Sequence, residues 1–348
     1  MKIPIENIYY LLCYSWNKLD EAEQVNVHAK DFTELLDLFA VVLKNGINQL
    51  IKRGFDRNYI EYSEDTKRLR GKIDFGISLK KNLLKKAQLH CHYDDLSHNI
   101  LHNQIIKSTV HNLINIENID KEIKDELRDL YLKLRGIDLI KIENKHFRMI
   151  QLNSNNYFYD FLLNICELIH DNIFIDENSG KFKFKDFIED DRKMATLFED
   201  FIRNFYKIEL QKHISPINVC REDINWDVRS KEESSSKFLP KMQTDISLEF
   251  ENDKLIIDTK YYQEALQSYY DTEKIISVNL YQILAYVTNI SAKGGINTNC
   301  RGMLLYPTVH KELKEKVNIQ NHDIHFNTIN LNQNWQKIHD DLIELVMN

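Results

Sequence analysis

The sequence predicts an α/β protein: a mixed sheet flanked by helices in the C-terminal half, preceded by an N-terminal part of helices and β-hairpins. Three observations lead to this prediction. The 348 residues are enough for two domains, each with its own core. The second half alternates helical and strand-like patterns in the order α-β-β-β-α-β-β-α, which is typical of a sheet covered by helices. The first half combines long amphipathic helices with short alternating strands.

Helical spacing of apolar residues is the main feature of the first half. It predicts helices over residues 5–16, 31–53, 96–116, 119–134 and 157–174. Asp31 and Ser97 are residue types that cap helix N-termini, so we expect them to begin the second and third of these helices. Alternating patterns predict two strands around a polar turn over residues 58–75 and further strands over residues 87–95 and 138–149, with Gly71 at a bulge or a close backbone approach.

The second half is predicted to form a domain of its own. Its patterns indicate helices over residues 190–213, 277–290 and 335–348, and strands over residues 217–228, 241–250, 254–262, 302–307 and 322–330. A tight turn at residues 251–253 makes the strands on either side antiparallel neighbours. We expect two domains, residues 1–180 and 181–348, because the polar stretch "DENSGK" at 176–181 is typical of a loop.

Composition and charge narrow the classes of function. The net charge of −7 and the pI of about 6.0 exclude a broad positive field that would attract nucleic acid, so DNA binding needs a local patch or a partner protein. Five scattered cysteines without a CxxC pair predict reduced thiols. The sequence shows no secretory leader and no run of about 18 apolar residues, so we expect a cytoplasmic protein.

An acid and a base end one strand that has the composition of a buried strand, "KLIIDTKYY" at residues 254–262. Asp258 follows three apolar residues, and Lys260 comes two positions later, so their side chains share one face. Asp245 lies on the preceding strand at a similar distance from the turn, which can place it beside Asp258. The alternative is a surface hairpin with solvated charges. Charges beside buried strands are costly unless they are paired or bind a metal, which favours a site.

This arrangement has the chemistry of a metal-dependent hydrolase. Two carboxylates at close range repel each other, and a hard divalent cation relieves that repulsion. Mg²⁺ prefers oxygen ligands and keeps several waters, and Mn²⁺ is its natural substitute. A lysine beside the cation can orient a water and stabilise a charged transition state. We therefore predict Asp245, Asp258 and Lys260 as catalytic residues of phosphodiester hydrolysis, with the two aspartates as metal ligands.

Two residues on predicted helices are further candidates for the same site. Glu199, on the helix over 190–213, is either an additional metal ligand or an ordinary solvated glutamate. Gln282, on the helix over 277–290, either hydrogen-bonds the lysine, a water or a phosphate, or is an ordinary polar position. The sequence leaves both alternatives open.

A histidine cluster in the first half offers a competing metal site. It consists of His90, His92, His98 and His102. Imidazole suits zinc, but no second cysteine or CxxC pair lies nearby. A charged corner between a strand and a helix is the plainer interpretation.

Segments from both halves resemble the McrC family. These segments are "IPIENIYYLLCYSW", "LRGKIDF", "YDDLSHNILHNQIIKSTV", "LPKMQTDISLEF", "LIIDTKYY", "NLYQILAY" and "GMLLYP". McrC proteins are the endonuclease subunits of the McrBC modified-cytosine (type IV) restriction systems, which act in phage defence, and they belong to the PD-(D/E)xK nucleases. The resemblance implies a restriction-endonuclease-like fold for residues 181–348 and Mg²⁺-dependent cleavage of double-stranded DNA.

The resemblance also assigns roles to individual residues. Asp245, Asp258 and Lys260 match the first acid, second acid and lysine of the PD-(D/E)xK motif. One departure is visible: Thr244 stands where the motif has proline, and Pro240 lies five residues before the first acid. Since that proline has a structural role, the departure leaves the catalytic prediction in place.

A partner is implied as well. McrB-type subunits are AAA+ GTPases that recognise DNA carrying 5-methylcytosine-type bases, and McrC-type subunits bind their hexameric ring. This chain has no G-x₄-G-K-[ST] motif, so GTP would act only through the partner. Residues 1–180 are then the partner-binding domain, with Arg68 and Arg70 either as contacts or on a solvated strand face. A stand-alone PD-(D/E)xK nuclease and a mainly non-catalytic activator of the motor remain alternatives.

Overall fold

The computed structural model describes residues 3–25, 32, 34–152, 156–175, 182–214, 216–228, 237–261, 266–269, 272–308 and 312–347. The chain forms two compact units. The sheet unit comprises Met1–Asp20, His28–Thr33 and Asp186–Asn348, and the helical unit comprises Glu21–Val27 and Glu34–Lys185. The loop predicted at residues 176–181 lies outside the described residues.

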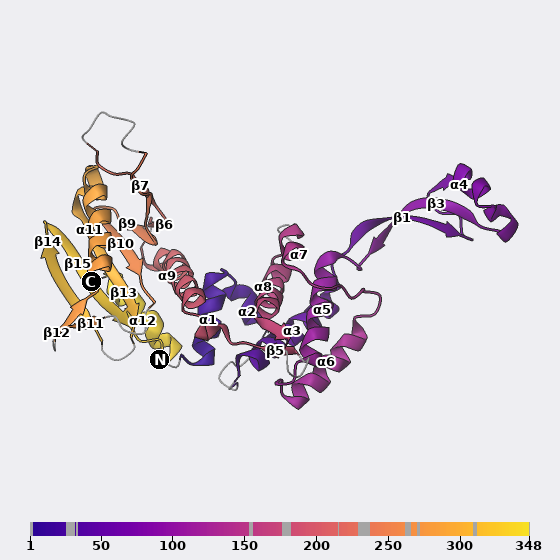
Figure 1. Ribbon diagram of the computed structural model, residues 1–348, viewed down its shortest axis with the longest axis horizontal. Coiled ribbons are helices and arrows are strands. Elements are labelled where there is room, and N and C mark those ends of the chain that lie inside the picture. Colours follow the sequence, from indigo (N-terminus) through magenta and orange to yellow (C-terminus); the bar gives the residue numbers. More distant parts are fainter. Residues whose placement is uncertain are drawn as a thin grey trace. The chain divides into compact units, whose positions relative to one another are not determined.

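A six-stranded mixed sheet forms the centre of the sheet unit, and its strand order is β14-β15-β13-β10-β9-β6 (Figure 1). In that order the strands span Lys314–Ile319, His322–Ile329, Cys300–Pro307, Lys254–Thr259, Ile246–Glu249 and Asn218–Cys220. β10, β13 and β15 are parallel, and the other neighbouring pairs are antiparallel. β10 therefore lies inside the sheet, and all of its residues are buried.

Helix α11 (Ser277–Ser291) covers one face of this sheet. Its apolar side chains, including Ile283 and Val287, pack against alternate strand residues such as Ile256 and Leu304. Gly302 of β13 permits this close packing, because a Cβ atom there would lie 2.7 Å from the Ile283 side chain. The helix thereby packs closely against β13 and β10.

The opposite face of the sheet is covered by α9 (Asp191–His213) and α12 (Trp335–Met347). The strand residues of this face, such as Leu255 and Ile257, are fully buried, and α9 contacts β10 while α12 contacts β15. A strand covered on both faces reads as a nearly continuous apolar run, which explains the sequence of β10.

Helix α1 (Ile5–Ser15) belongs to the sheet unit, whereas the predicted division placed it in the N-terminal domain. The Tyr14 hydroxyl donates to Glu209 of α9 at 2.9 Å, and the Tyr10 ring stacks on Trp335 of α12 at 4.6 Å between centroids. These partners are about 190 to 330 residues away in the sequence. No local pattern reveals such contacts, so the prediction of residues 1–180 as one domain is wrong for this helix.

The helical unit is built mainly from α-helices. They are α3 (Leu35–Arg53), α5 (Leu101–Asn115), α6 (Lys121–Lys133), α7 (Asn144–Met149) and α8 (Tyr157–Asn172), followed by the hairpin of β4 (Ile173–Ile175) and β5 (Phe182–Phe184). The short helix α2 (Leu19–Val25) lies where the chain passes from one unit to the other. Phe39, Ile105 and Phe161 are fully buried and form part of the core.

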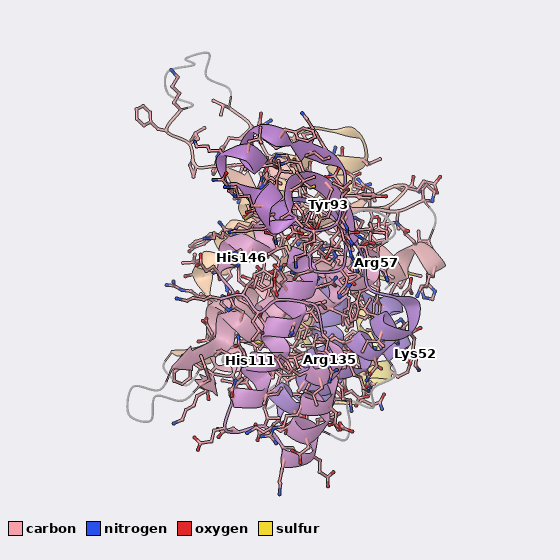
Figure 2. The ribbon with its side chains drawn as sticks, turned by 90° about the vertical axis from the view of Figure 1, so that its right-hand side faces the viewer. Lys52, Arg57, Tyr93, His111, Arg135 and His146 are labelled. Atoms are coloured by element: carbon pink, nitrogen blue, oxygen red, sulfur yellow. The ribbon has the colours of Figure 1, made fainter. Side chains whose placement is uncertain are left out.

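A three-stranded antiparallel sheet belongs to the same unit. It has the order β1-β3-β2, with β1 at Asn58–Thr66, β2 at Lys72–Asp74 and β3 at Leu89–Ser97. Helix α4 (Phe75–Lys80) and the 3-10 turn η2 (Leu83–Lys86) connect β2 to β3. Tyr93, labelled in Figure 2, marks β3. Gly71 has a φ of +56°, and a Cβ atom there would lie 2.2 Å from the His92 carbonyl, so the predicted close approach is confirmed.

The remaining elements are short. They are η3 (Phe187–Glu189), β7 (Asp223–Ile224), β8 (Met242–Gln243), β11 (Leu266–Tyr269), β12 (Thr272–Ile275) and η4 (Gly295–Asn299). β7 pairs with β8 and β11 pairs with β12. None of the helices in the described part of the chain is long and apolar enough to cross a membrane.

Several predicted boundaries differ from the structure. Ser97 ends β3 instead of capping α5, which begins at Leu101 with Ile100 at its N-cap. Helix α3 has Glu34 at its N-cap, and the expected cap Asp31 lies outside the described residues. The strands predicted over 138–149 are wrong, because a capping box of Glu143 and His146 begins helix α7 there.

Candidate active site

The hairpin of β9 and β10 brings the two predicted aspartates together. Its antiparallel register ends where Ile246 pairs with Ile257, so Asp245 and Asp258 lie just beyond the last pair. The charge of Asp245 acts on Asp258, which places the two carboxylates in the same neighbourhood. Lys260 Nζ lies 2.7 Å from Asp258 Oδ2, as the shared strand face predicts.

Asp258 is a buried carboxylate with an incomplete set of partners. Its side chain is 0% exposed, and neither of its oxygens accepts a hydrogen bond of good geometry from the described residues. Burial raises the pKa of Asp258 to about 7, Lys260 opposes that rise, and the charge of Asp245 adds to it. A buried acid of this kind is stabilised in its charged form by a further positive charge or by hydrogen bonds.

Asp245 is oriented by the residue between Asp258 and Lys260. The backbone N–H of Thr259 donates to Asp245 Oδ2 at 2.8 Å, and the Thr259 hydroxyl donates to the same oxygen at 3.0 Å. Both bonds fix the carboxylate at the end of the hairpin.

Helix α11 contributes Gln282 and Tyr286 to the surroundings of the two aspartates. The Gln282 amide donates to the Tyr286 hydroxyl at 2.7 Å. Burial raises the pKa of Tyr286, and the charges of Asp258 and Asp245 raise it further, so its phenol lies within electrostatic range of both acids. Sequence reasoning missed Tyr286, although its spacing of four residues from Gln282 on one helix was an available signal.

Glu199 has other partners. On α9 it accepts a hydrogen bond from Arg203 Nη1 at 2.9 Å and also forms an ion pair with Arg221. No contact in the described part of the chain joins Glu199 to Asp245 or Asp258. The structure therefore does not bring Glu199 to the carboxylate pair, because two guanidinium groups already hold its charge.

The carboxylate pair fits a hard divalent cation. Asp258 presents buried oxygens without hydrogen bonds of good geometry from the described residues, and Asp245 lies opposite it. Mg²⁺ binds one or two carboxylates and completes its shell with water or substrate oxygens. Among the described residues, no group of three or more His, Cys, Asp or Glu side chains could hold a metal ion. Asp245 and Asp258 are the residues that would hold such a cation.

Comparisons with known proteins identify the family of this chain. A family model described as "McrBC 5-methylcytosine restriction system component" matches residues 6–307. The protein "Type IV methyl-directed restriction enzyme EcoKMcrBC" of Escherichia coli (strain K12) is 34% identical over 343 residues, covering 99% of this chain and 97% of the relative. The chain belongs to the McrBC restriction-system family.

Two solved structures are similar to this McrBC-family chain. The first is the "Refined half-complex from tetradecameric assembly of Thermococcus gammatolerans McrB AAA+ hexamers with bound McrC", with a TM-score of 0.58 and 17% identity over 97% of this chain and 75% of that chain. The second is the "Cryo-EM structure of the Thermococcus gammatolerans McrBC complex", with a TM-score of 0.42 and 20% identity over 60% of this chain and 59% of that chain. The first likeness shows a shared fold.

The other end of β10 carries a second charged cluster, which sequence reasoning missed. Lys254 is 2% exposed and lies 2.7 Å from both Glu222 Oε2 and Glu249 Oε1. Lys293 of the segment after α11 lies 2.9 Å from Glu222 Oε1. Every charge in this cluster faces an opposite charge, so it ties β10 to its neighbours.

The histidines of the first half do not form one site. His90 Nδ1 lies 2.6 Å from Asp65, and His102 Nε2 lies 3.1 Å from Asp56. His98 hydrogen-bonds the Arg135 carbonyl at 3.3 Å. Each of these rings has its own partner, and the described part of the chain gathers no set of three metal-binding side chains.

Arg68 and Arg70 lie in the turn between β1 and β2, whereas the sequence was interpreted as a strand there. The Arg70 guanidinium lies 5.3 Å from the centre of the Tyr93 ring and 3.5 Å from Asp95. Turn residues do not alternate between faces as strand residues do, so the interpretation that the two arginines lie on a strand face is wrong.

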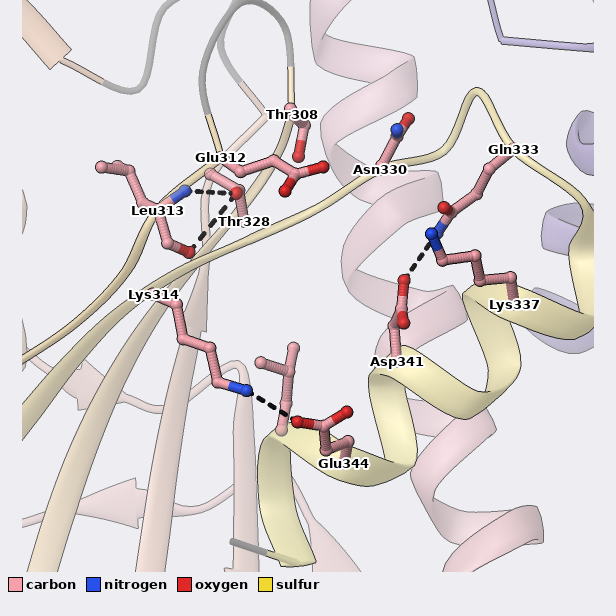
Figure 3. A pocket seen from close by; sticks show the side chains of 11 residues that line it. Thr308, Glu312, Leu313, Lys314, Thr328, Asn330, Gln333, Lys337, Asp341 and Glu344 are labelled. Atoms are coloured by element: carbon pink, nitrogen blue, oxygen red, sulfur yellow. Dashed lines mark hydrogen bonds and ion pairs between the residues drawn. The ribbon is translucent and has the colours of Figure 1, made fainter.

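A polar hollow of about 200 Å³ lies between β14, β15 and α12 of the sheet unit (Figure 3). Two internal contacts occupy its polar groups: Lys314 with Glu344 at 2.7 Å, and Gln333 with Asp341 at 2.7 Å. It contains none of the predicted site residues.

Proposed function

We propose that this chain is the endonuclease subunit of a modification-dependent restriction complex. Asp245, Asp258 and Lys260 would carry metal-dependent hydrolysis of the DNA phosphodiester. The observation that supports this most is Asp258: a fully buried carboxylate without a hydrogen bond of good geometry from the described residues, beside a second acid and a lysine. Membership in a restriction-system family supports DNA as the substrate of that site.

Each residue has a distinct part in the proposed chemistry. Asp245 and Asp258 would hold Mg²⁺ or Mn²⁺, which supplies positive charge against the phosphate and lowers the pKa of a bound water. The Lys260 ammonium would orient the attacking water and stabilise the charge that develops on the phosphate. The hydrogen bond between Gln282 and Tyr286 would limit the mobility of these two side chains beside the aspartates.

We further propose that an McrB-like AAA+ GTPase hexamer is the partner. The similar solved structure from Thermococcus gammatolerans contains McrB AAA+ hexamers with bound McrC. The net charge of −7 supports dependence on another protein that brings the DNA. The partner would also read the modified cytosine, and GTP would act only there.

The surface that supports such docking is the basic tip, which we define as residues 67–86. It holds eight Lys and Arg residues against one Asp. Arg70 pairs with Asp95 and Lys81 with Asp65, while the other six cations form no ion pair with any described residue. Four large apolar side chains of the tip are exposed by 55–70%: Leu69, Phe75, Leu79 and Leu84. Apolar side chains ringed by charge are typical of a protein interface.

Cleavage of a methylated plasmid tests the proposed function. The chain, an McrB-type partner, GTP and Mg²⁺ should together produce double-strand breaks, and omission of any one should prevent them. Asp258→Ala should abolish cleavage while stimulation of the partner's GTPase persists. Cleavage by the chain alone would instead support a stand-alone nuclease, and GTPase stimulation without any cleavage would support a non-catalytic activator.

Charge reversal in the basic tip tests the docking surface. Arg68→Glu combined with Arg70→Glu should weaken stimulation of the partner's GTPase at least about tenfold, because two contacts become repulsive. Lys52→Glu combined with Arg135→Glu is a matched control on the same unit, outside the tip (Figure 2). If both double variants weaken GTPase stimulation equally, the net charge of the unit matters and the basic tip has no special role.

A further inference from the structure

The hydrogen bonds of Asp245 are unusual because both described bonds come from one residue and end on one oxygen. Thr259 donates to Asp245 Oδ2 through its backbone N–H at 2.8 Å and through its hydroxyl at 3.0 Å. Thr259 is itself buried, with 8% of its surface exposed. Solvent therefore competes little for these bonds.

The end of the β-ladder explains why Thr259 has this partner. Pairing of β9 with β10 stops at Ile246 and Ile257. One residue before Asp245, the Thr244 N–H donates to the Glu222 carbonyl at 2.9 Å, so the chain has turned away from β10. The Lys260 N–H still pairs with the Leu305 carbonyl of β13 at 3.0 Å. The Asp245 carboxylate thus replaces a missing ladder carbonyl for Thr259.

We propose that Thr259 is the positioning residue for Asp245. Two donors fix Oδ2, so the carboxylate cannot rotate, and Oδ1 becomes the oxygen that Asp245 offers to a cation shared with Asp258. This inference rests on the proposed metal site. Thr259 lies between Asp258 and Lys260, and this proposal gives it a defined role. It orients the Asp245 carboxylate, while its two neighbours in the sequence face the cation.

Groups that orient a metal ligand are energetically important in metalloproteins. Their removal typically lowers metal affinity or activity by roughly 10–100-fold. Mutation cannot remove the backbone donor, so only the hydroxyl can be tested. A residue that merely ends the strand would affect stability alone, whereas a positioning residue also affects metal affinity.

The test compares three variants of the full chain by titration with Mn²⁺ in a calorimeter. Thr259→Val keeps the shape and removes the hydroxyl, and it should raise the Kd for Mn²⁺ about tenfold. Thr259→Ser keeps the hydroxyl and should stay within about threefold of the original chain. Thr109→Val is the control, because Thr109 is 1% exposed and its hydroxyl donates to the Ile105 carbonyl at 3.0 Å, in the other unit. It should leave the Kd unchanged.

The Mn²⁺ dependence of cleavage by the reconstituted complex should shift in parallel. If Thr259→Val fails to fold, Thr259→Ala removes the hydroxyl without placing a methyl group next to the Asp245 carboxylate. A lowered melting temperature with an unchanged Kd would overturn the inference and leave Thr259 a strand-ending residue. If Asp258→Ala also binds Mn²⁺ like the original chain, the metal site itself is wrong. A loss of binding in Asp258→Ala with normal binding in Thr259→Val rejects only the role of Thr259.

Discussion

Strand β10 begins with Lys254 and is followed directly by Lys260, and the two ends of the strand differ in how completely the charges around these lysines are paired. Lys254 is 2% exposed and has Glu222 and Glu249 each at 2.7 Å. Lys260 is 15% exposed and has Asp258 at 2.7 Å, but that carboxylate accepts no hydrogen bond of good geometry from the described residues.

The pKa directions express the same difference. Burial opposes the charged form of Glu222, yet Lys254 and Lys293 outweigh it and lower its pKa. Lys254 and Asn218 lower the pKa of Glu249. Burial instead raises the pKa of Asp258 in spite of Lys260. A fully compensated buried cluster holds a strand in place, whereas an under-compensated one is ready for a cation.

Removal of the acid at the under-compensated end should have the largest effect. We expect Asp258→Asn to lower the rate of plasmid cleavage by at least about a thousandfold, because one cation ligand is lost. Cleavage assays of the reconstituted complex measure this. Glu249→Gln at the other end should keep the rate within about tenfold, since it lies outside the site. Similar losses in both variants would remove the distinction between the two ends.

Breaking the compensated end should mainly lower stability. Lys254→Met leaves Glu222 and Glu249 without their shared cation, and we expect a loss of about 2–3 kcal/mol in the free energy of unfolding, reduced by the partial exposure of both acids. Urea unfolding measures it. The triple variant with Glu222→Gln and Glu249→Gln should recover part of the loss. An unchanged stability of Lys254→Met would contradict a structural role for the cluster.

The two ends should respond to pH in opposite directions. The pKa of Asp258 is raised, so its stabilising contribution is present below about pH 4 and is lost as pH rises through about 7. The pKa values of Glu222 and Glu249 are lowered, so their contribution is present at neutral pH and is lost in acid. In metal-free buffer, Asp258→Asn should remove a fall in stability between about pH 4 and 7, of at most about 1.4 kcal/mol per pH unit.

Removal of the two glutamate charges tests the pH dependence of stability at the other end of β10. The double variant Glu222→Gln and Glu249→Gln should flatten the loss of stability on the acid side and leave the slope between about pH 4 and 7 that comes from Asp258 intact. Urea unfolding across the pH range separates the two effects. A slope that persists in Asp258→Asn would mean that another group titrates there.

Glu199 should show the smallest effect. Because Arg203 and Arg221 already hold its charge, Glu199→Gln should change the Kd for Mn²⁺ less than about twofold and the stability by about 1 kcal/mol or less. Calorimetric titration and urea unfolding check both numbers. A tenfold weaker Kd would restore Glu199 as a metal ligand.

Much of the fold followed from local patterns, and the failures have identifiable causes. Long periodic segments such as α9 and α11 were predicted within two residues of their bounds, because their apolar faces are continuous. The edge strand β14 was missed because its residues are mostly exposed and show no alternation. The strands predicted near 138–149 failed because a capping box, which is a side-chain contact, begins α7 there.

The candidate site divides in the same way. The sequence by itself determined that Asp258 and Lys260 share a face and that Asp245 is near them, because strand alternation and a tight turn are local geometry. Only the tertiary structure decided that Asp258 is fully buried, that Thr259 holds Asp245, and that Glu199 pairs with arginines. Burial and hydrogen-bond partners depend on elements far apart in the chain, such as α11 and β13 around β10, and a local pattern does not contain them.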